Sequence, residues 1–258
     1  MPILFVVIPV YNEVATAKQC VKLVVDAPLV DGWSKTLVIV DDHSDDEAAA
    51  LLKTLTDELA NDGVNITLHC HDVNRGKGAA LNTGFDFVLQ SQPHDDDLVI
   101  IQDADLEYDP DDYPALMKPI IEGRAQAVVG SRWGTHNQLQ SLGRKLHRQG
   151  NGFVSSFSNL MTGYRLTDME CCYKVFSIKV LRKLRPMLTE NRFGIEPQMI
   201  ASLSKLKVKI EQVPVSYNPR SVAAGKKIGW VDGIRAFYVV LRERFRPMKK
   251  LRTDPNNH

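Results

Sequence analysis

The sequence lacks several features that mark common protein classes. It has four cysteines, and none of them forms a Cys-x-x-Cys pair, so neither a zinc site nor a disulfide framework is indicated. No apolar run approaches the ~20 residues that a membrane-spanning helix needs. The opening residues, MPILF, contain no basic segment of the kind that begins a signal peptide. We therefore expect reduced cysteines, a cytoplasmic setting and no membrane-spanning anchor.

Two further motifs are missing. Residues 74–78 (NRGKG) contain glycine and lysine, but the GxxxxGK[ST] spacing of a Walker A loop is absent. The histidines form no HxxxH or paired Cys pattern, so we interpret them as structural or surface residues. Neither an internal repeat nor a low-complexity tract occurs, and we expect no nucleic-acid partner.

Charge is distributed unevenly along the 258 residues. Residues 1–130 carry 8 Lys and Arg against 23 Asp and Glu, whereas residues 131–258 carry 24 against 8. An acidic half can hold cations, and a basic half can meet phosphates or an anionic surface. The alternative is that the two halves only offset each other.

Apolar β-branched runs alternate with helical patterns through the first half of the chain. The predicted strands are residues 3–8, 36–40, 64–69, 98–102 and 127–129, and the predicted helices are 14–25, 47–60, 76–89 and 110–122. This alternation predicts an α/β fold with a mostly parallel sheet and helices on both faces.

Polar clusters follow four of these strands, at residues 11–13, 41–46, 74–77 and 103–107. Ligands of parallel sheets bind outside the carboxyl ends of the strands. We therefore expect these clusters to gather at one edge of the sheet.

One cluster places three acids at alternate positions after a buried strand. Asp103, Asp105 and Glu107 face the same way in extended backbone, and converging carboxylates repel one another unless a cation lies between them. Hard oxygen ligands suit Mg²⁺ or Mn²⁺ that also binds phosphate oxygens. For Asp109 and Pro110 we favour a simple helix start, with an N-cap and a first-turn proline.

Two other clusters allow two interpretations each. Asp41 and Asp42 suit recognition of a base or ribose, or they are acids at a helix N-terminus. Residues 74–78 either admit a phosphate at a helix N-terminus or form a capped turn.

The second half is less regular. We expect a loop over residues 133–143, helices at 153–161, 195–206 and 231–246, strands at 172–177 and 207–215, and a loop at 217–229.

Together these motifs resemble glycosyltransferase family 2, in its dolichyl-phosphate mannose synthase and polyprenyl-phosphate glycosyltransferase branch. The resemblance covers about residues 3–240 and rests on the number and order of the matching stretches: VIPVYNE at 7–13, VDDHSDD at 40–46, NRGKGAALN at 74–82, DADLE at 103–107, GSR at 130–132, LTDMECCYKVF at 166–176, NRFGIE at 191–196, YNPR at 217–220 and GKKIGW at 225–230.

The resemblance implies a GT-A fold, with a Rossmann-like sheet and a C-terminal acceptor-side extension. It implies that residues 1–130 form a nucleotide-sugar-binding half and that residues 131–258, with their basic C-terminal helix, form an acceptor-binding half of one continuous domain.

The family pattern also implies site residues on the donor side. The base and ribose would contact Pro9, Tyr11, Glu13 and Asp41, with Asp42 nearby. Arg75 and Lys77 would lie near the nucleotide or its pyrophosphate. Asp103 and Asp105 match the DxD motif, with Asp105 the more direct ligand of Mg²⁺ or Mn²⁺, and Glu107 stands where relatives often carry Gln.

On the acceptor side, the resemblance implies catalytic roles for Asp168 and its neighbour Glu170. A carboxylate base would take a proton from an acceptor hydroxyl, whereas an ionised acceptor phosphate would need only positioning. Cys171 and Cys172 depart from the residues that relatives often carry there, which affects the expected shape of the pocket.

Basic residues in the second half of the chain suggest two kinds of anionic partner. Arg132, Arg220, Lys226 and Lys227 would bind an acceptor phosphate, unless the lysines belong to a solvated loop. The C-terminal helix, with its basic run at 242–250, suits peripheral contact with anionic lipid. The alternative is that its apolar residues pack on the sheet domain.

These inferences predict a metal-dependent hexosyltransferase, inverting by family analogy. It would move a sugar from a UDP- or GDP-sugar to a polyprenyl phosphate or a related membrane-linked acceptor, at the cytoplasmic membrane face. The alternatives are transfer to a soluble or glycan hydroxyl with Asp168 as base, and a nucleotide-sugar-binding module without turnover.

Overall fold

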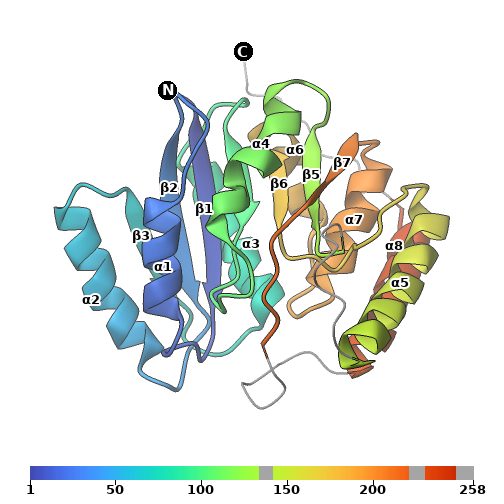
Figure 1. The fold of residues 1–258 in the computed structure, drawn as a ribbon, viewed down its shortest axis with the longest axis horizontal. Helices are drawn as coiled ribbons and strands as arrows, with labels where there is room; N and C mark the ends of the chain where they lie inside the picture. The colour runs from blue at the N-terminus through green and yellow to red at the C-terminus, as the bar shows by residue number, and fades with distance from the viewer. Residues whose placement is uncertain (134–141, 221–229, 248–258) are drawn as a thin grey trace.

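The fold is a seven-stranded sheet flanked by helices (Figure 1). The computed structural model describes residues 1–133, 142–220 and 230–247. The strand order is β3-β2-β1-β4-β6-β5-β7, and only β6 pairs antiparallel with its neighbours in this sheet. The strands are β1 (Ile3–Val10), β2 (Ser34–Asp41), β3 (Ile66–Cys70), β4 (Leu98–Ile101), β5 (Ala127–Ser131), β6 (Lys174–Ser177) and β7 (Ile210–Pro214). The predicted mostly parallel α/β sheet is therefore confirmed.

The central strands are buried on both faces, which explains their continuous apolar runs. The helices of the first half are α1 (Ala17–Asp26), α2 (Ala48–Asn61), α3 (Lys77–Gln90) and α4 (Tyr113–Ile121). A 3₁₀ turn, η1 (Pro110–Asp112), precedes α4, and Asp109 caps it by accepting a hydrogen bond from Asp111 N. The predicted helix start at Asp109 and Pro110 is confirmed.

The second half contains α5 (Leu142–Thr162), α6 (Ile178–Leu184), η3 (Arg185–Met187), α7 (Ile195–Lys205) and α8 (Trp230–Phe245). Helix α5 begins eleven residues before the predicted start at 153, and α6 was not predicted. The predicted loops at 133–143 and 217–229 lie largely outside the described residues. No helix in the described ranges is both long enough and apolar enough to cross a membrane.

Candidate active site

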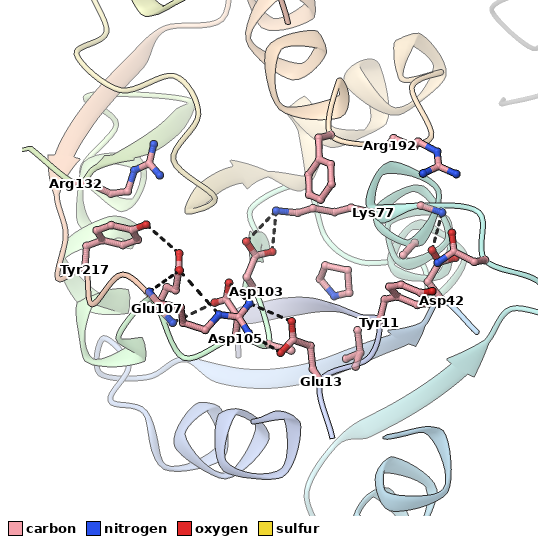
Figure 2. A pocket seen from close by; sticks show the side chains of 18 residues that line it. Tyr11, Glu13, Asp42, Lys77, Asp103, Asp105, Glu107, Arg132, Arg192 and Tyr217 are labelled. Atoms are coloured by element: carbon pink, nitrogen blue, oxygen red, sulfur yellow. Dashed lines mark hydrogen bonds and ion pairs between the residues drawn. The ribbon is translucent and has the colours of Figure 1, made fainter. Parts of the chain in front are cut away.

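A cavity of about 650 Å³ opens at the carboxyl edge of the sheet. It brings together ten residues that the sequence singled out: Pro9, Tyr11, Glu13, Asp42, Lys77, Asp103, Asp105, Glu107, Arg132 and Arg220. All four predicted polar clusters contribute to its lining. The expected convergence of strand ends is therefore confirmed, and Figure 2 shows these side chains around the cavity.

Asp103 is held by a lysine. The ammonium of Lys77, on the first residue of α3, lies 2.8 and 2.9 Å from the two carboxylate oxygens of Asp103 (Figure 2). Lys77 Nζ also lies 3.0 Å from Oε1 of Glu196, whose other oxygen pairs with the fully buried Lys174. Burial alone would lower the pKa of Lys77, but Asp103 and Glu196 outweigh it and raise that pKa well above its ordinary value. These four residues form a ladder of alternating charge from the core to the cavity.

The guanidinium of Arg220 lies between Glu13 and Asp105, two further acids of the cavity. Arg220 donates from Nη1 and Nη2 to the two carboxylate oxygens of Glu13, at 2.9 and 3.1 Å. Its Nη2 also lies 3.1 Å from Oδ2 of Asp105. Arg220 was expected at an acceptor phosphate, and here its guanidinium contacts the acids of the donor side.

Glu107 accepts hydrogen bonds from residues 217–220, the segment that ends at Arg220. Its carboxylate accepts hydrogen bonds from the Tyr217 hydroxyl and the Arg220 backbone N–H, both at 2.9 Å. Its carbonyl oxygen accepts from Asn218 N at 2.8 Å. Glu107 therefore holds residues 217–220 at the cavity.

Among the acids of the cavity, Asp105 has a carboxyl pKa that is clearly raised. The pKa of Asp105 is raised to about 7, chiefly by burial and next by the nearby carboxylates of Asp103 and Glu107, while the Glu107 backbone N–H and Arg220 oppose this rise. Such mutual repulsion is characteristic of a site for a cation. Within the described residues, however, no group of three or more His, Cys, Asp or Glu side chains could hold a metal on its own.

The acids after β2 have structural partners. Asp42 accepts hydrogen bonds from Arg75 N at 2.9 Å and Gly76 N at 2.6 Å, and its Oδ1 lies 2.6 Å from His71 Nδ1. The buried Asp41 carboxylate accepts from the Ser44 backbone and hydroxyl and is not part of the cavity lining. Asp42 thus fixes the glycine loop, while Arg75 itself is exposed.

The backbone of residues 190–192 lies directly against Gly76 and Gly78 and leaves no room for a side chain at either position. A Cβ on Gly78 would lie 2.3 Å from the Glu190 carbonyl oxygen, and one on Gly76 would lie 2.5 Å from that of Asn191. Ala79 N donates to the Asn191 carbonyl at 3.0 Å. Close packing of residues 190–192 is therefore a sufficient reason for both glycines.

Asp168 lies beneath the cavity wall and is fully buried. Its two oxygens accept from Nε and Nη2 of Arg132, both at 2.7 Å, and Oδ2 also accepts from Arg132 N at 3.1 Å. The Arg132 guanidinium in turn lies over the rings of Trp133 and Tyr217, 5.4 and 5.3 Å from their centroids. Asp168 therefore orients a cavity arginine.

Glu170 stands apart from the cavity lining. Burial raises its pKa to about 7, with a further contribution from Glu196. Lys226 and Lys227 lie outside the described residues. Eight lining residues were not predicted as site residues: Val10, Asn74, Gly76, Ala80, Ala104, Arg192, Phe193 and Tyr217. All eight stand in the motif stretches of the sequence, which could have indicated them.

A family model described as "Glycosyl transferase family 2" matches residues 5–185. An uncharacterized protein of Methanocaldococcus jannaschii is 27% identical over 243 residues, covering 93% of this chain and 92% of its own. The UDP-N-acetylglucosamine–dolichyl-phosphate N-acetylglucosaminyltransferase of Methanococcus voltae is 28% identical over 249 residues, covering 93% of this chain and 95% of its own.

Among solved structures, the glucosyl-3-phosphoglycerate synthase of Mycobacterium tuberculosis has a similar fold. Its complex with UDP superposes with a TM-score of 0.64 at 20% identity, covering 96% of this chain and 81% of that one. Its complex with Mn²⁺, UDP-glucose and phosphoglyceric acid has a TM-score of 0.62 at 18% identity, with the same coverage.

Proposed function

The chain belongs to glycosyl transferase family 2 and has the GT-A fold, and from that premise we propose that it transfers a sugar from a nucleoside diphosphate to a polyprenyl phosphate or a related membrane-linked acceptor. The observation that carries this proposal is the meeting, in one cavity, of an acidic donor side and an oriented arginine, Arg132. The relative from Methanococcus voltae, whose name specifies a dolichyl-phosphate acceptor, supports the acceptor class.

The donor side fits a hard divalent cation such as Mg²⁺ or Mn²⁺. Asp105 provides oxygen ligands in a place where like charges already raise its pKa. Both oxygens of Asp103 are taken by Lys77, and both oxygens of Glu107 hold residues 217–220. The Asp105 oxygens have longer contacts, with Oδ1 3.1 Å from Glu107 N and Oδ2 3.1 Å from Arg220 Nη2. Asp105 would therefore be the principal protein ligand, with diphosphate and water completing the shell. When bound, the ion would neutralise the departing diphosphate.

The chain's own residues would prepare the rest of the reaction. Pro9, Tyr11 and Glu13 would contact the nucleotide, and Lys77 would keep Asp103 in place. Arg220, already beside Asp105, is within the same cavity as the expected diphosphate and would add positive charge there. Arg132 would bind the acceptor phosphate and direct it to the anomeric carbon, which implies inversion if one displacement occurs.

The engagement of Asp168 by Arg132 favours a phosphate acceptor over a hydroxyl acceptor. A general base needs a carboxylate oxygen that reaches the acceptor proton, and both Asp168 oxygens accept from Arg132. An ionised phosphate needs no such base, and a fixed guanidinium suits it.

The test is transfer by the purified chain. UDP- and GDP-sugars would be incubated with a short-chain polyprenyl phosphate and Mn²⁺ or Mg²⁺, and glycolipid would be measured. We expect transfer that requires the cation and is abolished by Asp105→Ala. Asp111→Ala, at an exposed acid nearby, is the matched control and should retain activity. Binding of UDP with metal but without any sugar release would instead indicate a binding module.

A further inference from the structure

Helix α8 has an apolar stripe that no described residue covers. Its members recur at positions i, i+4, i+7 and i+11, which is one face of a helix. Their exposed fractions are 60% for Ile234, 54% for Tyr238, 45% for Leu241 and 76% for Phe245. On the opposite face, Val239 and Val240 are fully buried. The alternative that the apolar residues of this helix pack on the sheet domain therefore does not hold for Ile234 and Leu241.

Helix α5 extends the same surface. Phe153 and Leu160, two turns apart, are 70% and 77% exposed. The two helices pack together through Phe237, whose ring centroid lies 5.5 Å from that of Phe153 and 5.0 Å from that of Phe157. Figure 1 shows them side by side at the end of the sheet beyond β7. Six of the eleven exposed large hydrophobic residues in the described ranges thus lie on this one helix pair, which is a patch rather than scatter.

We propose that this α5–α8 surface, defined by Phe153, Leu160, Ile234, Tyr238, Leu241 and Phe245, docks on an anionic lipid bilayer. Three of its six side chains are aromatic, as is usual for helices that lie in a membrane interface. The docking surface would be rigid, because it is built on two packed helices.

The charges around the surface favour anionic lipid. Helix α8 and the residue after it carry Arg235, Arg242, Arg244 and Arg246. The acids that pair with three of these arginines, Glu190 and Glu243, are themselves buried. Residues 152–162 of α5 contain no charged side chain. Among the side chains of α5 and α8 that the structure describes, positive charge therefore faces outward and no acid is exposed. Two copies docked through this surface would bring like charges together.

The surface is also tied to the candidate active site. Glu190 accepts hydrogen bonds from Arg235 and Arg242 of α8. Its carbonyl oxygen packs against Gly78, the second residue of α3, which follows the cavity residues Gly76 and Lys77. A bilayer on α5–α8 would therefore hold the cavity at a fixed orientation to lipid-borne acceptors. This role of the surface rests on the proposed function, whereas the docking itself does not.

Vesicle flotation tests the docking directly. The full chain would be mixed with vesicles of equal parts phosphatidylglycerol and phosphatidylcholine, without nucleotide sugar or polyprenyl phosphate. We expect the protein to float with these vesicles and to remain behind with pure phosphatidylcholine. The double variant Leu241→Ser/Phe245→Ser should bind at least about tenfold more weakly, since each side chain loses apolar burial. The control Leu23→Ser/Ile121→Ser removes exposed apolar residues elsewhere and should bind as the parent does.

Circular dichroism and light scattering accompany the flotation. Both double variants should retain the parent's unfolding transition, since the changed residues are exposed. Unchanged flotation of Leu241→Ser/Phe245→Ser, equal binding to neutral and anionic vesicles, or a dimer that only this variant dissociates would each overturn the proposal. Transfer to a water-soluble short-chain acceptor without vesicles should be unaffected by the variant. Failure of that transfer in the parent would refute the proposed function and leave the flotation result intact.

Discussion

Asp168 holds the guanidinium of Arg132 through both of its carboxylate oxygens, with Nε–Oδ2 and Nη2–Oδ1 distances of 2.7 Å. The pair is buried, and only the arginine reaches the cavity lining. A two-pronged charge-assisted contact fixes the plane of the guanidinium as well as its position. Asp168 can therefore influence acceptor binding by fixing the orientation of Arg132.

Asp168→Asn and Arg132→Lys should impair acceptor binding to a similar extent. Each change breaks the two-pronged contact, so we expect the KM for the acceptor to rise about 10- to 100-fold, with donor affinity unchanged. The double variant should be no worse than either single variant, because both remove one unit. Steady-state kinetics and donor titration calorimetry measure these quantities. A fall in kcat at constant KM that recovers at high pH would indicate that Asp168 acts as a base.

Glu196→Gln should destabilise the fold strongly. The change leaves the fully buried ammonium of Lys174 without its carboxylate, a situation that costs about 3–5 kcal/mol of unfolding free energy. Urea unfolding measures the loss. Adding Lys174→Met to the same protein removes the stranded charge and should recover part of it. A loss below about 1 kcal/mol in the single variant would mean that the ladder is not a stabilising element.

Gly78→Ala should be far more damaging than Gly152→Ala. The new methyl group at 78 would meet two backbone carbonyl oxygens, of Glu190 and Arg192, at 2.3 and 2.9 Å. We expect a loss of at least about 2 kcal/mol, because backbone cannot move aside as a flexible side chain can. At Gly152, within α5, nothing lies within 4 Å of the added Cβ, and alanine should raise helix stability by up to about 1 kcal/mol. Thermal unfolding of both variants compares the two positions, and equal losses would contradict the packing argument.

The sequence predicted the parallel part of the fold well, because the buried strands there have unambiguous apolar runs. It also predicted that the polar clusters would converge, since this follows from topology once the strands are parallel. Helix α5 was placed too late because residues 142–151 contain few apolar side chains. The short helix α6 was missed, since its start depends on the Ser177 side chain accepting from Val180 N.

Partnerships within the site could not be predicted from local pattern. Arg220 and Glu13 are 207 positions apart, and nothing in either segment indicates that their side chains meet. The glycines at 76 and 78 suggested room for a phosphate, whereas the structure fills that space with the backbone of residues 190–192. Such contacts depend on how separate segments pack, and only the tertiary structure supplies that information.

The stability of the fold should depend on pH through the buried carboxyl of Glu170. The pKa of Glu170 is about 7 in the folded protein, against an ordinary value of 4.5, because burial disfavours its charged form. Between these two values the folded chain keeps a proton that the unfolded chain releases. Glu170 therefore contributes stability that is fully present below about pH 4.5 and is lost as the pH rises to about 7.

Relative to Glu170→Gln, the parent should lose on the order of 3 kcal/mol of unfolding free energy across this interval and then remain level at higher pH. Urea unfolding of both proteins at a series of pH values measures the difference. Glu58→Gln, at an exposed position of α2, controls for the removal of a carboxylate as such. A pH-independent difference between parent and Glu170→Gln would show that this carboxyl titrates alike in both states. In that case its burial beside Asp168 and Glu196 would not favour the protonated form.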